Sequence, residues 1–259
     1  GHLGEDGGCP KINSGMFQSM IEMGDVMGVF VGHDHDNDYI AQEYGIALAY
    51  GRVSGHDAYG DLERGARIIE LYEDGRQFDT WIATPSGKSL AYYYPSAITS
   101  DDEAIVPLPA KQVAPQNQGV AYLYYEGKFK HTDHFKTNGT KKDEGVMKNF
   151  SILDAPAKDH FGYEFKAYLR IPQTGVYNFY LYSDDGSLLY IDGKQVIDNN
   201  GSHSAARKGG KIALEEGFHE IHLLYFEDYM GEKLKLKISS RWMEEQEIPD
   251  AMLYLPLKK

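Results

Sequence analysis

The second half of the chain alternates apolar and polar side chains. Between residues 164 and 171, every second side chain is apolar: Phe165, Ala167, Leu169 and Ile171. Residues 221–225 and 234–238 repeat the pattern. A period of two turns one row of side chains into a core and the other toward water, as in half-buried β-strands. Short strands at this spacing predict an all-β sandwich or barrel over residues 118–259.

Turn signals separate these predicted strands. The segment 172–175 begins with proline and ends with glycine, and the apolar run that follows it ends at Asp184, Asp185 and Gly186. Asp192-Gly193 separates two further short runs. This dipeptide favours a tight hairpin, because type I′ turns need positive φ at both central residues.

The first third of the chain has a different pattern. Apolar side chains at helical spacing predict one helix over residues 13–23, which Asn13 or Ser14 can cap. The apolar and β-branched run at 26–31 predicts a buried strand. Further strand candidates lie at 46–50, 66–71 and 80–83.

A proline-rich stretch lies between these two parts. Five of the ten prolines fall between Pro85 and Pro115, in a stretch with no sustained period. Because proline fixes φ and removes a hydrogen-bond donor, we expect a partly extended linker over residues 85–117. The chain is therefore expected to be mainly β, with one domain at 1–84 and a second at 118–259.

The composition of the chain limits the kinds of partner that we expect it to bind. The net charge of −13 argues against nucleic acid, which needs basic patches, whereas acidic clusters suit metal ions. No apolar stretch approaches the ~18–20 residues that a membrane helix needs. The single cysteine, Cys9, excludes an internal disulfide. The chain begins with Gly1-His2-Leu3 rather than methionine, so we expect a fragment whose export signal is not visible.

The loop that follows the predicted strand at 26–31 carries candidate chemistry. It holds two histidines and three aspartates, namely His33, His35, Asp34, Asp36 and Asp38. Imidazole and carboxylate together suit zinc, iron or manganese. A solvated turn has the same composition, but the preceding strand and the density of polar groups favour a metal site.

Gly32-His33-Asp34-His35 resembles the last metal motif of calcineurin-like metallophosphoesterases, in the purple-acid-phosphatase-like branch. The matching segments are 13–15, 24–26, 29–38, 50–55 and 64–67. By this resemblance, residues 1–84 are the partial α/β, C-terminal segment of such a domain. His33 and His35 would each ligate one ion (iron, zinc or manganese) of a two-metal centre that hydrolyses a phosphate monoester or diester.

The other metal motifs of that family are absent from this sequence. Two imidazoles alone hold a catalytic ion poorly, because a catalytic site uses three or more protein ligands. We therefore expect this chain by itself to be inactive as a phosphatase. Arg52, in a glycine-flanked segment, either contacts a phosphate or forms a structural pair with Asp57 or Asp61.

A second set of motifs lies in the predicted sandwich. The segments 183–187, 190–194, 199–203, 217–219 and 225–227 resemble the PA14 domain, a β-sandwich of bacterial toxins, glycosidases and yeast adhesins. In the adhesins, the aspartates that match Asp184 and Asp185 bind calcium and a sugar together, and Asn199 and Asn200 would add oxygen ligands. Alternatively, the two aspartates close a tight turn by bonding backbone amides.

Three functions follow from these resemblances. The chain is part of a phosphoesterase whose PA14 module binds a glycan or a surface, or it is a calcium-dependent carbohydrate-binding module without catalysis, or the sandwich braces a catalytic domain. The expected partners are a phosphoester substrate and a glycan, with no nucleic acid and no membrane span. We expect a secreted, periplasmic or cell-surface location.

Overall fold

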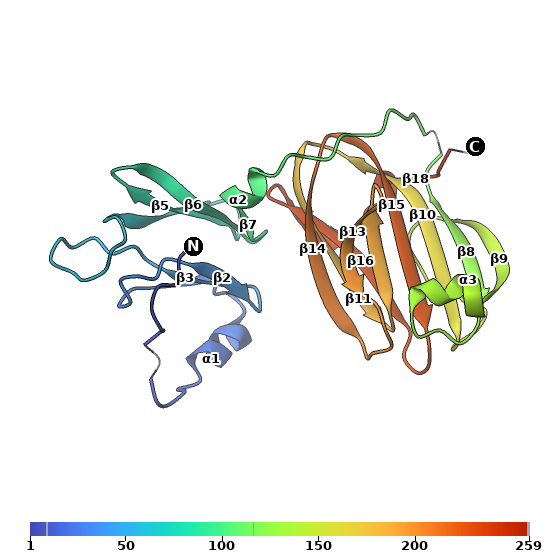
Figure 1. Cartoon of the computed structure of the whole chain (residues 1–259), viewed down its shortest axis with the longest axis horizontal. Helices are drawn as coiled ribbons and strands as arrows, with labels where there is room; N and C mark the ends of the chain where they lie inside the picture. Colours follow the sequence, from blue (N-terminus) through green and yellow to red (C-terminus); the bar gives the residue numbers. More distant parts are fainter. Residues whose placement is uncertain (9, 116, 258–259) are drawn as a thin grey trace. The chain divides into compact units, whose positions relative to one another are not determined.

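The computed structural model describes residues 1–8, 10–115 and 117–257, so Cys9 lies outside the described residues. The chain forms two compact units, Gly1–Ile105 and Val106–Lys259 (Figure 1). Strands dominate the secondary structure of both units, which confirms the mainly β class. Each unit is described by itself.

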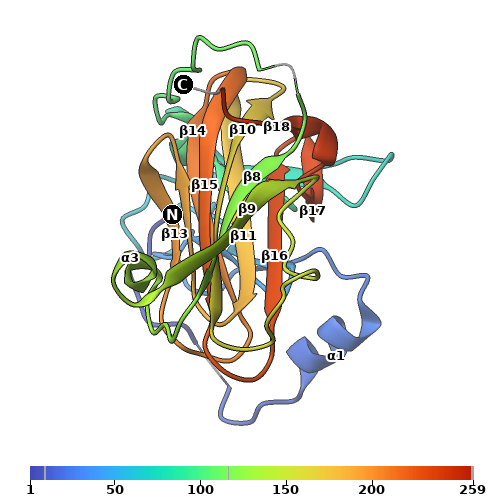
Figure 2. The same ribbon diagram turned by 90° about the vertical axis from the view of Figure 1, so that its right-hand side faces the viewer.

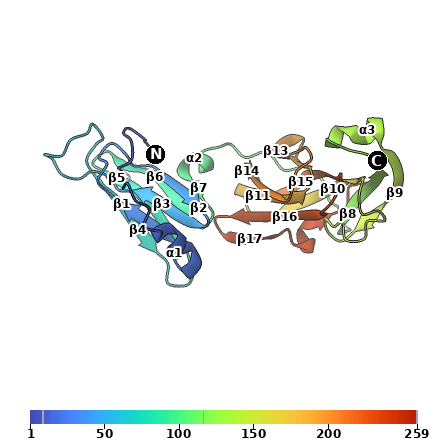
Figure 3. The same cartoon turned by 90° about the horizontal axis from the view of Figure 1, so that it is seen from below.

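The first unit contains a three-stranded sheet in the order β1-β3-β2 (Figure 3). Its strands are β1 (Gly28–Val31), β2 (Ile40–Glu43) and β3 (Ile46–Tyr50). β1 runs parallel to β3, whereas β2 is antiparallel to it. β1 was expected to be buried, but it lies at one edge of this sheet and is only half-buried.

The helix predicted over residues 13–23 is shorter than expected. α1 spans Met16–Met23, and its N-cap is Gly15 in the left-handed conformation, with no side-chain cap bond. The side chain of Asn13 instead accepts a hydrogen bond from the Gly15 N–H, at 2.9 Å. Asn13 therefore turns the chain in front of the helix and does not cap it.

A four-stranded sheet, in the order β4-β5-β6-β7, completes the first unit. Its strands are β4 (Ala66–Leu71), β5 (Phe78–Thr84), β6 (Gly87–Tyr94) and β7 (Ile98–Thr99), and the short helix α2 (Ser100–Glu103) follows. The linker prediction is thus wrong for 87–103. Pro85 and Pro95 mark the turns on either side of β6, so the prolines punctuate a sheet.

Within its described residues, the second unit contains two sheets. The seven-stranded sheet contains β8 (Val120–Glu126), β9 (Thr140–Met147), β10 (Phe161–Ile171), β12 (Ser187–Ile191), β13 (Lys194–Asn199), β15 (Gly217–Glu227) and β18 (Leu253–Tyr254). The four-stranded sheet contains β11 (Gly175–Asp184), β14 (Ala206–Leu214), β16 (Lys233–Ser240) and β17 (Met243–Glu247). The short helical turns η1 (Thr132–His134) and α3 (Phe135–Asn138) lie between β8 and β9, and η2 (Asp250–Met252) lies between β17 and β18.

The two sheets share one apolar core. It draws Phe165 and Leu169 from β10, Phe179 from β11, Leu223 from β15 and Ile238 from β16, all fully buried. The alternation in the sequence therefore predicts the inner face correctly, and the sandwich is confirmed. Figure 2 shows β8, β9 and β10 running along one side of it.

The residues just after Ile105 belong to the sandwich. The Leu108 N–H donates to the Ala213 carbonyl at 2.9 Å, and the Glu215 N–H donates back to the Leu108 carbonyl at 3.0 Å. The Lys111 N–H donates to the Phe218 carbonyl at 2.8 Å. This segment is thus held against the ends of β14 and β15.

Among the described residues, none of the helices combines the length and the apolar character that crossing a membrane requires.

Candidate functional site

Three carboxylates converge at one end of the sandwich. Asp184 ends β11, Asp185 follows it, and Glu227 ends β15. One ligand oxygen from each lies within 4.8 Å of the others. Strand pairing explains the convergence, because Ser187 lies opposite Tyr225 and the Phe226 N–H donates to the Gly186 carbonyl at 2.9 Å. Within residues 1–8, 10–115 and 117–257, no other group of three or more such residues gathers in this way.

Glu227 is the residue that the sequence reasoning missed. Its side chain is fully buried, and its Oε1 has no hydrogen-bond partner. Burial, reinforced by the charge of Asp185, raises the pKa of the Glu227 carboxyl to about 8. Burial also raises the pKa of Asp184. A hard cation would satisfy the bare oxygen and offset the repulsion among these acids, so the donor set fits calcium.

Asp185 also has a structural role. Its Oδ1 accepts the His203 N–H at 2.7 Å, and its Oδ2 accepts the Asp228 N–H at 2.9 Å. The pair was predicted either to bind calcium or to bond the amides of its own turn. The amides that Asp185 bonds belong to two distant loops instead. Each carboxylate oxygen keeps a second lone pair, so this anchoring is compatible with an ion.

The two asparagines predicted as additional ligands are engaged elsewhere. The buried Asn199 donates its amide nitrogen to Ser183 Oγ at 2.9 Å. The side-chain oxygen of Asn200 accepts the Thr132 N–H at 3.1 Å and so holds the loop before η1. These contacts make both asparagines loop supports. A sequence signal for Glu227 did exist, since it continues the inward-facing series of 221, 223 and 225.

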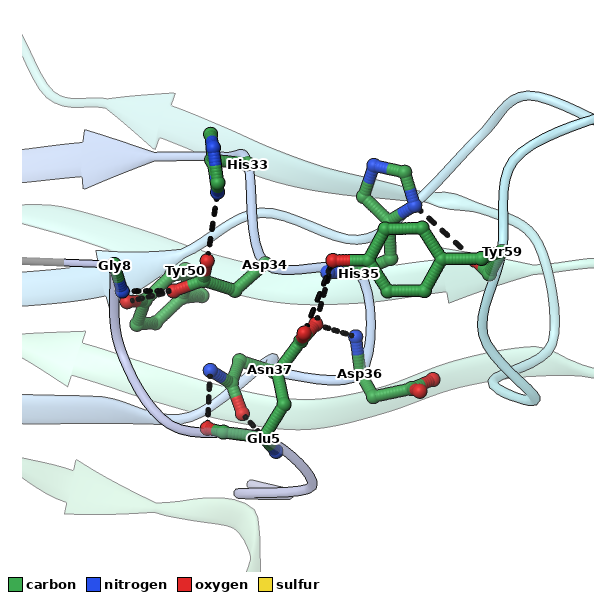
Figure 4. A network of polar contacts seen from close by, with 9 residues as sticks. All are labelled: Glu5, Gly8, His33, Asp34, His35, Asp36, Asn37, Tyr50 and Tyr59. Atoms are coloured by element: carbon green, nitrogen blue, oxygen red, sulfur yellow. Dashed lines mark hydrogen bonds and ion pairs between the residues drawn. The ribbon is translucent and has the colours of Figure 1, made fainter.

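The loop after β1 forms a second candidate site. His33 and His35 both line a hollow of about 250 Å³. The Nδ1 of His33 contacts Asp34 Oδ1 at 2.8 Å, and the Nδ1 of His35 contacts the Tyr59 carbonyl at 3.1 Å (Figure 4). Metal-binding histidines show the same arrangement, in which one ring nitrogen is held by a carboxylate or carbonyl and the other stays available.

The remaining polar groups hold that loop in place. Tyr50 donates to Asp34 Oδ2 at 2.6 Å, and this bond lowers the pKa of Asp34 to about 2. The Asp36 N–H donates to Glu5 Oε1 at 2.9 Å. The His35 ring stacks on Tyr59, with 4.0 Å between ring centroids, whereas the side chain of His33 is 86% exposed. The loop is therefore built by contacts from residues on both sides of it in the sequence.

Arg52 pairs with a different aspartate from those predicted. Its Nη2 donates to Asp38, and its Nη1 donates to the Glu63 carbonyl at 3.1 Å. The structural alternative therefore describes Arg52, with Asp38 in place of Asp57 or Asp61.

A family model described as the PA14 domain matches residues 116–253, which is more than half of the chain. The chain belongs to the PA14 domain family.

Curated relatives include two proteins of Arabidopsis thaliana. "Probable inactive purple acid phosphatase 14" is 39% identical over 82 residues, which are 31% of this chain and 20% of that protein. "Probable inactive purple acid phosphatase 29" is 42% identical over 79 residues, covering 30% of this chain and 20% of that protein. The chain thus spans about a fifth of the length of these relatives. Among solved structures, the "PA14 sugar-binding domain from RTX adhesin" aligns with 54% of this chain and all of its own, at 15% identity and a TM-score of 0.46.

Proposed function

We propose that the PA14 domain binds Ca²⁺ through Asp184, Asp185 and Glu227, and that the ion presents open positions to the hydroxyls of a glycan. One observation carries the proposal: Glu227 places a buried oxygen without a partner beside two further acids. Leaving a buried carboxylate unpaired is costly, and a bound cation removes that cost.

The chemistry of calcium extends this proposal to sugars. Ca²⁺ takes six to eight oxygen ligands, which is about twice the number of carboxylates gathered here. The remaining positions are open to water or to neighbouring hydroxyls of a sugar. The paired aspartates resemble those of the adhesins, which bind calcium and a sugar together, so glycans are the class of ligand to test.

Calorimetric titration of the full chain with Ca²⁺ tests the site. We expect Asp184→Asn and Glu227→Gln to weaken Ca²⁺ binding at least tenfold, because each removes a charged ligand. Asp198→Asn is the matched control, since Asp198 is exposed and lies outside the three-carboxylate group. A glycan array probed in Ca²⁺ and in EDTA tests the second step. Equal binding by all three variants and the parent chain would disprove the site.

A second function concerns the first unit. We propose that residues 1–84 derive from a metallophosphoesterase, and that His33 and His35 offer their Nε2 atoms to iron, zinc or manganese. The held Nδ1 atoms support this proposal. When bound, the metal would supply a Lewis acid for a phosphoester. The held Nδ1 atoms would fix the tautomer and the orientation of the two imidazole rings.

Two assays separate the parts of this second proposal. This chain is expected not to hydrolyse p-nitrophenyl phosphate, whichever metal ion is added, because two imidazoles make an incomplete site. Binding of Zn²⁺ is expected to weaken in His33→Ala and His35→Ala but not in His56→Ala, as measured by equilibrium dialysis. Zn²⁺ affinities that are the same in all four proteins would exclude the histidine site.

The bracing role of the sandwich and the cellular location of the protein each have a test of their own. If the sandwich only braced a catalytic domain, the chain would bind no glycan on the array, either in Ca²⁺ or in EDTA. We also propose a secreted, periplasmic or surface location, since weak calcium sites fill only where Ca²⁺ is abundant, as outside cells. Fractionation of the source cells with an antibody to the chain tests that location.

A further inference from the structure

A groove of about 720 Å³ lies on the outer face of the seven-stranded sheet. Side chains of β10, β12 and β15 line its floor, and Pro256 and Leu257 form part of its wall. It is separate from the carboxylate group. His222 in the groove and Glu227 in the group are five residues apart on β15, about 17 Å along the strand, and they face opposite sides of the sheet.

The strand register places the groove's side chains in rows. Lys166 on β10 lies opposite His222 on β15, and His222 lies opposite Tyr190 on β12. The next row contains Tyr168 opposite Glu220. Neighbouring strands are about 4.8 Å apart, so the first row crosses roughly 10 Å of sheet. Two half-buried tyrosines thus flank a strip of polar groups.

The charges along this strip nearly cancel, with one lysine against two acids. Glu164 contacts Lys166 Nζ at 2.5 Å and His222 Nε2 at 3.0 Å, and the latter contact is the main reason why the pKa of Glu164 falls to about 2. Glu220 adds another acid to the wall. Because its lysine is paired with Glu164, the groove has no free cation with which to select an anionic ligand.

The backbone of the groove is already paired on both sides. β15 lies between β10 and β12, β12 lies between β15 and β13, and β10 lies between β15 and β8. A peptide cannot add to these strands, because strand addition needs a free edge. The ligand must therefore be recognised by side chains alone.

We propose that this groove binds a neutral glycan chain without a metal ion. Sugar rings present apolar C–H faces that pack on the rings of Tyr168 and Tyr190, while Lys166, Glu220 and His222 bond the hydroxyls at the ring edges. The site is additional to the proposed calcium site and does not depend on it.

Titration of the full chain in EDTA tests the proposal, with cellohexaose, laminarihexaose, xylohexaose and mannohexaose as probes. At least one of these glycans is expected to bind with the metal removed. Tyr190→Ala is expected to weaken that binding about tenfold, whereas Tyr190→Phe keeps the ring and most of the affinity. Tyr180→Ala is the control, because Tyr180 is a half-buried tyrosine of β11, in the other sheet.

The outcomes separate the two sites. Binding that survives EDTA and Asp184→Asn but falls in Tyr190→Ala supports the groove. Binding that disappears in EDTA, or equal affinities for Tyr190→Ala and Tyr180→Ala, overturns the groove and leaves the calcium site standing. Failure of every probe to bind in EDTA also counts against the groove. The Tyr190→Phe variant keeps the aromatic ring and removes only the hydroxyl. If it lost glycan binding as fully as Tyr190→Ala does, ring stacking would not be what holds the glycan.

Discussion

We expect Glu227 to favour binding of Ca²⁺ and to lower the stability of the chain when no ion is bound. Its carboxyl is buried beside Asp184 and Asp185 without a partner for Oε1, and its pKa is raised to about 8. Without an ion, the folded chain must therefore either hold a proton that the unfolded chain releases or bear the repulsion among these acids, and both lower its stability. Glu227→Gln removes that cost. We expect the variant to gain about 1 kcal/mol of unfolding free energy in EDTA, or a melting temperature about 3 °C higher.

The same variant is expected to lose most of the thermal shift that Ca²⁺ gives the parent chain. Ligand linkage makes that shift about 1.4 kcal/mol at a Ca²⁺ concentration ten times Kd. Differential scanning fluorimetry with and without Ca²⁺ measures both effects. A variant that melts lower than the parent in EDTA would show that Glu227 is a structural acid.

Glu164 makes the folding stability of the protein depend on pH in the acid range. Its pKa is lowered from 4.5 to about 2 by the bond from His222 and then by Lys166, so the folded state holds its proton less tightly than the unfolded chain. The stability it contributes is therefore present above about pH 4.5 and is lost as the pH falls toward 2.

Glu164→Gln should make that acid limb shallower and reduce stability at pH 7 by about 1 kcal/mol, since the Lys166 partner is half-exposed and screened. Urea unfolding between pH 3 and pH 7 measures the slope. Parallel curves for the parent chain and the variant would contradict the assignment.

Sequence reasoning at this scale finds residues in local motifs and misses those that strand pairing brings together. Asp184 and Asp185 are adjacent and visible as a pair. Glu227 joins them only because β12 pairs with β15, forty-odd residues away in the chain. Arg52 shows the same limit, since its partner Asp38 is set by how the loop after β1 folds back.

At the scale of elements, glycines allow two strands to approach closely. A Cβ on Gly210 of β14 would lie 2.1 Å from the Val196 carbonyl oxygen of β13, a backbone atom that cannot turn aside. Gly210→Ala is expected to destabilise the protein by about 1–3 kcal/mol.

Gly209→Ala provides the comparison, because its Cβ would come closest to the Tyr180 ring, at 3.0 Å, and would lie at an ordinary contact distance of 3.5 Å from the Phe179 carbonyl oxygen. We expect a smaller loss there, since a half-buried ring can shift. Chemical denaturation of both variants gives the two free energies. Equal losses would mean that the difference in strand propensity between glycine and alanine, rather than the approach of β13, sets the effect.

Alternation predicted β10 and β15, whereas β6 was missed. β10 and β15 are among the longest strands in the described residues, and burial alternates through the middle of each. β6 ends in three buried or half-buried tyrosines, so its alternation fades just where the prolines gather. Proline density alone therefore does not separate a linker from a hairpin with proline turns.

For the whole molecule, the boundary of the sandwich can be tested by truncation. In a chain of residues 106–259, Leu108 still packs against the core and keeps its backbone hydrogen bonds to Ala213 and Glu215. The Lys111 N–H still donates to the Phe218 carbonyl. A chain of 118–259, the boundary predicted from sequence, loses all of these.

We expect the shorter chain to be less stable by about 3 kcal/mol, at roughly 1 kcal/mol for each hydrogen bond. Both chains retain the shared core, so both should fold, and their urea midpoints make the comparison. Equal midpoints would show that residues 106–117 are a passive tether.

The anchoring by Asp185 has a consequence for how this protein can change. It holds two loops through main-chain N–H groups, which every amino acid except proline offers. The two anchoring bonds therefore make no demand on the side chains at positions 203 and 228, and these bonds can persist when those side chains change. Evolution, or a library randomised in the two loops, can change their side chains and leave the anchor untouched.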